Sequence, residues 1–268
     1  MDSTRFETYL RRENMAHNTV VAYSFVARDY LARHKSVCKS GLLAYRAALI
    51  DAYKAKTVNL RVAALNKFLE FVGRGELRLK GVKVQQASYL ENVISNADYE
   101  FFKERLRSEA DKKWYFVVRF LAATGARVGE LVCFKAEHVA LGHIDICSKG
   151  GKARRIYIPA GLRAEAAEWL AGAGRPHGFL FTNWRGLRLT TRGVAQQLKV
   201  LARRHGLDER VVYPHSFRHL FAKNFLAASG DLPLLADLMG HEKLDTTRVY
   251  LRKSSAEQRG VVDASVTW

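Results

Sequence analysis

Two short stretches in the second half of the chain carry residue types that bind anions and transfer protons. In the first, His215 and Arg218 lie three residues apart just after Pro214, and proline suits the first position of a helix because that position needs no N–H. Residues three apart share one helix face, so we expect the imidazole and the guanidinium to point the same way, away from the core. The opposite face is apolar at helical spacing and is expected to pack on the core: Phe217, Leu220, Phe221, Phe225 and Ala228.

The second stretch follows a short apolar helix, residues 234–239, that should end at Gly240, since glycine is common just after a helix. His241 comes next, and Asp245 can cap a new helix that carries Tyr250. A tyrosine phenol has an ordinary pKa near 10, so it becomes a good nucleophile only where positive groups stabilise the phenolate. Arginines close to Tyr250 would supply that stabilisation.

Two further stretches lie upstream. Residues 123–131 read Ala-Thr-Gly-Ala-Arg-Val-Gly-Glu-Leu, which places Arg127 and Glu130 three residues apart, so that they can pair on one helix face. Residues 143–158 alternate on both sides of Ser-Lys-Gly-Gly, which predicts a β-hairpin with Lys149 at its tip. A lysine, with an ordinary pKa near 10.4, is a proton donor at neutral pH without special help.

Taken in their order along the chain, the four stretches resemble the motifs of the tyrosine recombinase family, the phage integrases and Xer-type enzymes, over residues 123–250. The resemblance implies a site-specific DNA recombinase or integrase. It implies a supporting role for Glu130, which would orient the first arginine, and a catalytic role for six residues: Arg127, Lys149, His215, Arg218, His241 and Tyr250. All six positions are filled, which argues against an inactive relative.

The resemblance also implies a mechanism. The two arginines would clamp the scissile phosphate, and Tyr250 would attack it to give a 3′-phosphotyrosine and a free 5′-hydroxyl. Lys149 would protonate the leaving oxygen, with Lys152 in the same turn as its competitor, while His215 and His241 would assist at the phosphate. The phosphotyrosine keeps the bond energy, so rejoining needs neither ATP nor a metal. The sequence has no phosphate-binding glycine loop and no acidic metal cluster, and we expect no cofactor.

Composition indicates a nucleic-acid partner. The 268 residues include 44 Lys and Arg against 26 Asp and Glu, which gives a formal charge of +18 and a pI near 10.0. Such a surplus attracts polyanions, so we expect double-stranded DNA target sites as the partner. The three cysteines form neither a zinc pattern nor an even disulfide framework. The N-terminus lacks a signal region and no apolar run is long enough to span a membrane, so we expect a cytoplasmic protein that does not bind membranes.

Residues 1–80 are expected to form a bundle of four short amphipathic helices, with Asn18 capping the second. They hold 15 Lys and Arg against 7 Asp and Glu, a denser surplus than in the rest of the chain. The resemblance implies that this bundle is the family's core-binding domain. Candidate DNA-binding residues lie on its polar faces and in the hairpin turn: Arg11, Arg12, Arg28, Lys54, Lys56, Arg61, Lys67 and Lys152.

Residues 81–95 lack periodicity and are interpreted as an extended polar linker, and residues 96–268 as the catalytic domain with a C-terminal tail. Within that domain, the apolar run at residues 114–123 predicts a buried helix, and residues 179–181 predict a short strand. The expected fold is mainly α with a small β-sheet. It consists of an N-terminal helical core-binding bundle and a C-terminal tyrosine-recombinase catalytic domain.

Two other functions compete with this interpretation. A catalytically silent helical DNA-binding regulator is disfavoured by the complete residue set, and a type IB topoisomerase-like enzyme by the spacing of Gly-His and Thr-Thr-x-x-Tyr. The histidines outside the motifs, His138, His205 and His219, are interpreted as structural. The target site stays open, as does the type of event: integration, excision, inversion or dimer resolution.

The resemblance further implies a homotetramer on DNA, formed from free monomers, that exchanges strands through a Holliday junction. We expect no additional arm-binding domain before the bundle, which would favour a simple recombinase acting on short core sites. The chain ends on apolar residues, although chain ends are usually polar: Val261, Val262, Val266 and Trp268. This tail would be buried either in its own catalytic domain or in a cleft of the next protomer, a head-to-tail contact that closes a ring.

Overall fold

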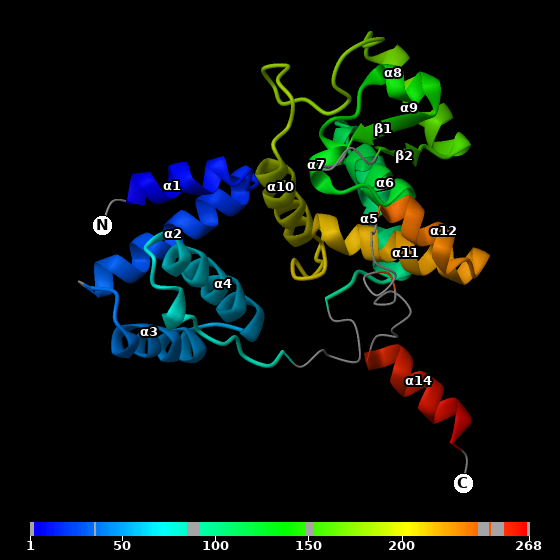
Figure 1. The fold of residues 1–268 in the computed structure, drawn as a ribbon. Coiled ribbons are helices and arrows are strands. Elements are labelled where there is room, and N and C mark those ends of the chain that lie inside the picture. Colours follow the sequence, from blue (N-terminus) through cyan, green and yellow to red (C-terminus); the bar gives the residue numbers. More distant parts are fainter. Residues whose placement is uncertain are drawn as a thin grey trace. The chain divides into compact units, whose positions relative to one another are not determined.

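The computed structural model describes residues 3–34, 36–84, 92–147, 153–240, 247 and 255–266. The chain divides into two compact units, Met1–Gln86 and Ala87–Trp268. Helices dominate both units, and the described residues form a single sheet of two strands (Figure 1). This arrangement confirms the expected fold class, mainly α with a small β-sheet. None of the helices seen in these residues combines the length and the apolar character that crossing a membrane requires.

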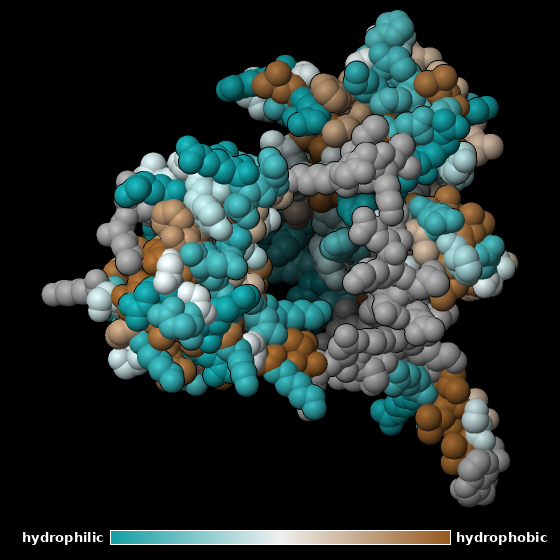
Figure 2. Space-filling model, in the orientation of Figure 1, coloured by the Kyte–Doolittle hydropathy of each residue, from teal (hydrophilic) through white to brown (hydrophobic). Residues whose placement is uncertain are grey.

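The first unit is a helical bundle, and the face of it seen in Figure 2 is mostly hydrophilic with scattered apolar patches. Inside it, the rings of Phe6 and Phe68 meet edge-on with centroids 5.1 Å apart. The second helix begins at His17, directly after Ala16, so the expected cap at Asn18 is wrong. Val20, in the first turn of this helix, is buried in the core. The elements are α1 (Ser3–Arg12), α2 (His17–Arg33), α3 (Lys39–Ala52), α4 (Ala55–Phe71) and the 3₁₀ turn η1 (Gly75–Leu77).

Both described ends of the segment 81–95 are attached to a unit. At the first end, Asn59 of α4 donates to the Val82 carbonyl and accepts from the Val82 N–H, at 2.9 and 2.7 Å. At the other end, the buried residue Ile94 donates its N–H to the Ser216 hydroxyl of the second unit at 2.7 Å. Residues 81–84 therefore contact the first unit, and residues 92–95 contact the second unit.

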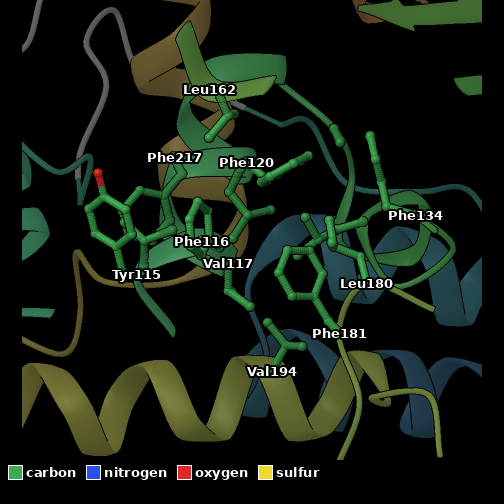
Figure 3. Close-up of a cluster of buried hydrophobic side chains, with 14 of the residues drawn as sticks. Tyr115, Phe116, Val117, Phe120, Phe134, Leu162, Leu180, Phe181, Val194 and Phe217 are labelled. Carbon is green, nitrogen blue, oxygen red and sulfur yellow. The ribbon is translucent and has the colours of Figure 1, made fainter. Parts of the chain in front are cut away.

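The second unit is built around α6, whose residues Val117, Val118, Phe120 and Leu121 are fully buried. Aromatic side chains from later parts of the chain, Phe134, Phe181 and Phe217, gather against this helix (Figure 3). The helices of this unit are α5 (Asn96–Ser108), α6 (Lys113–Thr124), α7 (Val128–Leu131), α8 (Ala136–Leu141), α9 (Ala160–Gly172), α10 (Thr191–Arg204), α11 (Pro214–Ser229), α12 (Leu232–Met239) and α14 (Ser255–Ser265).

The predicted hairpin is present as two antiparallel strands, β1 (His143–Cys147) and β2 (Ala153–Tyr157), paired from His143 with Tyr157 to Cys147 with Ala153. The turn between them lies outside the described residues. The expected strand at residues 179–181 is wrong, because Phe179 makes only an isolated bridge to Lys135. Leu180 and Phe181 are apolar because they are buried in the core, and burial does not require a strand.

Candidate active site

Arg218 lies on α11 and is almost fully buried, with 1% of its surface exposed. Its two terminal nitrogens donate to the Gly125 carbonyl at 2.5 Å and to the Met239 carbonyl at 2.6 Å. The expectation that α11 holds both polar groups outward is therefore wrong for Arg218, although His215 is exposed. The chain after α6 and the end of α12 cover this side of α11, which a helical pattern alone cannot foresee.

Arg127 and Glu130 form an ion pair around the start of α7. Arg127 is the residue before the helix and has extended backbone angles, so the pair closes a helix N-terminus and does not lie along a helix face. Glu130 accepts from the backbone N–H of Arg127 at 2.7 Å and from its guanidinium at 3.0 Å. The Arg127 side chain stays 42% exposed, whereas that of Glu130 is only 12% exposed, so a shielded carboxylate holds an open guanidinium in place.

The two arginines meet at the C-terminal end of α12. Arg218 donates to the Met239 carbonyl, and the second terminal nitrogen of Arg127 lies 3.4 Å from the Gly240 carbonyl. Gly240 closes the helix with φ of 60°, a left-handed angle that glycine adopts without steric cost. Two cationic groups far apart in sequence thus converge on two consecutive backbone carbonyls.

His215 shares the electrostatic field of both arginines. Although part of its surface is exposed, loss of solvent around the imidazole lowers the pKa of His215, and the Arg218 and Arg127 charges lower it further, which favours the neutral imidazole. One helical turn on, His219 has its ring centroid 6.1 Å from that of His215. Burial, followed by His215 and Arg218, lowers the pKa of His219 to about 4. A neutral imidazole can both donate and accept a proton, which suits a group beside a phosphate.

The remaining four residues of the predicted site and turn lie outside the described residues: Lys149, Lys152, His241 and Tyr250. Described residues bound the segments that hold three of them. β1 and β2 flank the turn of the two lysines, and Gly240 precedes His241.

Arg154 of β2 is a site residue that the sequence analysis missed. It donates to the Glu130 carboxylate at 2.5 Å and to the Leu238 carbonyl at 2.7 Å, and its side chain is 10% exposed. The sequence did contain a signal for Arg154. Strand residues two apart lie on the same face, and Arg154 lies on the face that carries the buried residues Ile156 and Ile158.

The predicted DNA-binding residues of the first unit fall into two groups. Arg61 pairs with Asp29 at 3.4 Å and stacks 4.2 Å from the Tyr53 ring centroid. Lys67 pairs with Glu13 and Glu70, at 3.3 and 3.0 Å. The others have exposed side chains, and among them Arg11 pairs with Glu7 within α1: Arg11, Arg12, Arg28, Lys54 and Lys56.

Histidines outside the motifs have structural partners. His205 lies 3.0 Å from the Glu109 carboxylate, and the His138 ring accepts the backbone N–H of Lys135 at 3.1 Å. Within the described parts of the chain, no three His, Cys, Asp or Glu side chains gather in a way that could hold a metal ion. The geometry thus defines a mainly helical protein whose second unit gathers Arg127, Arg154 and Arg218 at the end of α12.

Comparison with known proteins identifies the class. The sequence profile of the phage integrase family matches residues 90–257. Tyrosine recombinase XerA of Pyrococcus furiosus is 29% identical over 96% of this chain and 91% of its own. XerA of Thermococcus kodakarensis is 30% identical over 92% of this chain and 89% of its own.

Solved structures share the fold. The XerH recombinase bound to a palindromic difH substrate in a post-cleavage complex matches with a TM-score of 0.72 and 20% identity, over 100% of this chain and 85% of the other. A lambda integrase dimer bound to a COC′ core site matches with a TM-score of 0.71 and 17% identity, over 92% of this chain and 93% of the other.

The chain belongs to the phage integrase family. It is a tyrosine-type site-specific DNA recombinase, as the motifs predicted.

Proposed function

We propose that this recombinase cleaves a DNA strand by attack of the Tyr250 phenol oxygen on a phosphodiester bound by Arg127 and Arg218. The observation that carries the proposal is the convergence of these two arginines on the carbonyls of Met239 and Gly240, directly before His241 in the sequence. Guanidinium groups bind phosphate oxygens through paired N–H donors and stabilise the charge that develops on them.

In the proposed step, the phenol oxygen forms a bond to phosphorus while its proton passes to the neutral imidazole of His215, and the bond from phosphorus to the 5′-oxygen breaks. Lys149 gives the departing oxygen a proton, so the products are a 3′-phosphotyrosine and a free 5′-hydroxyl. His215 and His241 contact the phosphate. The reverse step, with a 5′-hydroxyl of another strand as nucleophile, rejoins DNA without an external energy source.

The burial of Arg218 adds a requirement to this scheme. Arg127 is 42% exposed and can meet a phosphate directly, whereas Arg218 is 1% exposed. A phosphate can reach the Arg218 guanidinium only after the chain that covers it moves aside. We propose that DNA contacts Arg127 first and that Arg218 joins as the site assembles on the substrate.

The test is Tyr250→Phe on a nicked suicide substrate, in which the freed end diffuses away and traps the covalent complex. The wild-type chain should give a 3′-linked adduct on a denaturing gel. Tyr250→Phe should bind the same duplex with unchanged affinity and form no adduct. An adduct that persists in Tyr250→Phe would assign the nucleophile to another residue.

We propose duplex DNA target sites as the partner and the cytoplasm as the compartment. The formal charge of +18 and the exposed cations of the first unit support a duplex as the ligand of a core-binding unit, residues 1–80, and of a catalytic unit, residues 96–268, joined by the segment 81–95. Solved relatives in complex with DNA substrates have the same fold.

The proposed assembly is a homotetramer on two sites, formed from monomers, that exchanges strands through a Holliday junction. The tail supports a contact between protomers, because Val261 and Val262 of α14 and Val266 just after it are 44%, 55% and 46% exposed. Figure 2 shows apolar, brown surface on this helix. Exposed apolar residues on a short helix favour a partner surface.

Deletion of residues 259–268 tests this assembly by band-shift titration. It should leave binding of one protomer to a half-site unchanged and weaken the complex of four protomers on two sites. If the truncated chain forms the four-protomer complex at the same concentration as the full chain, the tail plays no part in assembly.

A further inference from the structure

We propose that Arg154 is a positioning residue of the cleavage site. From β2 it holds the Glu130 carboxylate, and through Glu130 the guanidinium of Arg127, against the C-terminal end of α12. The inference rests on the proposed function, since it concerns the arginine that would bind the phosphate. Arg154 is not among the six predicted catalytic residues.

The contacts of Arg154 span three elements. One terminal nitrogen donates to Glu130 of α7 at 2.5 Å, and the other donates to the Leu238 carbonyl of α12 at 2.7 Å. Both partners of the ion pair are shielded, with 10% of the Arg154 side chain and 12% of the Glu130 side chain exposed. Shielded, charge-assisted hydrogen bonds are short and directional, so they restrict where Glu130 can lie.

Gly240 packs directly on the stem of Arg154. A Cβ placed on Gly240 would lie 2.6 Å from the Arg154 Cδ, closer than side chains tolerate, and the residue has φ of 60°. The Gly240 carbonyl in turn lies 3.4 Å from Arg127. The contacts therefore close a ring, from Arg154 to Glu130, to Arg127, to Gly240 and back to Arg154.

The charges of this ring explain why it leaves Arg127 available. Glu130 accepts from two arginines, one through each oxygen: Oε1 from the Arg127 side chain and Oε2 from Arg154. One carboxylate between two guanidinium groups leaves a net positive charge of one on the ring. Because the Arg154 side chain is 10% exposed and that of Arg127 is 42% exposed, the charge is presented to solvent mainly through Arg127, where an anion can reach it.

The geometry requires arginine at position 154. Its two bonds run to acceptors on different helices, which a planar fork can span and a single ammonium group cannot. Arg154→Lys keeps the positive charge and much of the aliphatic stem, so it separates the loss of geometry from the loss of charge.

The neighbouring Arg155 is a matched control. It lies on the opposite face of β2, is 47% exposed and pairs with Asp145 of β1 at 2.8 Å. Arg155→Lys makes the same chemical change one residue further along the strand and leaves the bonds of Glu130 intact.

The experiment measures three quantities for the full-length wild type, Arg154→Lys and Arg155→Lys: melting temperature, half-site affinity and the rate of covalent-complex formation on the suicide substrate. We expect Arg154→Lys to slow covalent-complex formation by about 100-fold, the effect of a misplacement near 1 Å, with affinity unchanged. Arg155→Lys should react at the wild-type rate.

Two further measurements identify the route of the effect. A substrate with a 5′-bridging sulfur, whose leaving group needs no proton, should not restore the rate of Arg154→Lys, because the fault lies at the phosphate. If Arg154 acts through Glu130, then Glu130→Gln combined with Arg154→Lys should be no slower than Glu130→Gln alone.

Several outcomes would overturn the inference. One is covalent-complex formation at the wild-type rate in Arg154→Lys, and another is an equal loss of rate in Arg155→Lys. A third is a restored rate of Arg154→Lys on the 5′-bridging sulfur substrate. The last is a loss of rate in Arg154→Lys that equals the fraction of the variant that is unfolded at the assay temperature. A wild-type chain that forms no adduct would refute the proposed function itself, and this inference with it. If the wild type forms the adduct and Arg154→Lys forms it at the same rate, only the role of Arg154 is refuted.

Discussion

The two units of the chain carry their positive charge in different ways. In the first unit, cations such as Arg12, Arg28 and Lys56 lie on exposed helix faces. In the second, Arg218 is buried and the Arg154 side chain is only 10% exposed, and each donates to acceptors on other elements. Exposed cations contribute to binding a polyanion in small, roughly equal steps, whereas buried ones are held in a single geometry. The first arrangement suits attachment to a DNA backbone, and the second suits chemistry at one phosphate.

The largest effect should come from Arg218→Ala. The change removes the proposed phosphate ligand, and it also leaves the Gly125 and Met239 carbonyls without this donor. We expect covalent-complex formation to fall by about 10²–10³-fold, the typical loss for one charge-stabilising donor. The free energy of unfolding should fall by about 1–3 kcal/mol for each carbonyl left unsatisfied.

Urea unfolding and the suicide-substrate assay measure these two losses. Arg210→Ala is the control, because its side chain is 78% exposed and pairs only locally with Asp208. If Arg218→Ala unfolds at the wild-type urea concentration, the buried arginine is not part of the structural core, and the contrast between the units fails.

The second prediction separates two cations of the catalytic unit by their roles. Lys149→Ala and Arg127→Ala should each slow cleavage by about 10²-fold or more. A 5′-bridging sulfur should restore Lys149→Ala, because a thiolate leaves without a proton, but should leave Arg127→Ala impaired. Single-turnover rates on the two substrates give the answer. Restoration of both variants, or of Lys152→Ala alone, would reassign the proton donor.

The third prediction concerns the pH dependence of stability. The pKa of His219 is about 4 in the folded chain, against an ordinary value near 6.5, so the unfolded chain binds one more proton between these values. Stability from this group is complete above pH 6.5 and is lost as pH falls towards 4, with a slope of at most about 1.4 kcal/mol per pH unit.

Urea titrations at several pH values test this slope. His219→Gln should flatten the slope between pH 4 and 6.5, and His177→Gln, whose side chain is 81% exposed, should not. Equal slopes in the wild type and His219→Gln would show that burial of His219 does not control stability.

The smallest effects should come from single cations of the first unit. Arg12→Ala, Arg28→Ala, Lys54→Ala and Lys56→Ala should each weaken half-site binding modestly. Each should reduce the slope of log affinity against log salt by about 0.9 for every phosphate that the variant no longer neutralises. Salt-dependent band shifts measure this slope.

Arg61→Ala is the matched comparison, because Arg61 is 14% exposed and paired with Asp29. It should leave the salt slope unchanged and lower the unfolding midpoint instead. A reduced slope in Arg61→Ala would mean that its guanidinium leaves Asp29 to bind DNA.

Local patterns in the sequence determined the elements, because they depend on spacing within a few residues. Pro214 marked the start of α11, Gly240 the end of α12, and alternation around residues 148–151 the two strands of the hairpin. The order of the motifs determined the family. The wrong cap at Asn18 and the wrong strand at residues 179–181 show the limit, since packing overrode the local preference at both places.

Tertiary structure alone decided which cations are buried and what they touch. Helical spacing put Arg218 on a polar face but gave no information about the chain after α6 and the end of α12, which cover it. Arg61 and Lys67 matched the exposed cations in sequence, and only packing revealed their acidic partners. The ring through Arg154, Glu130, Arg127 and Gly240 joins segments distant in sequence. Such contacts depend on the three-dimensional path of the whole chain, and no periodicity within one element encodes them.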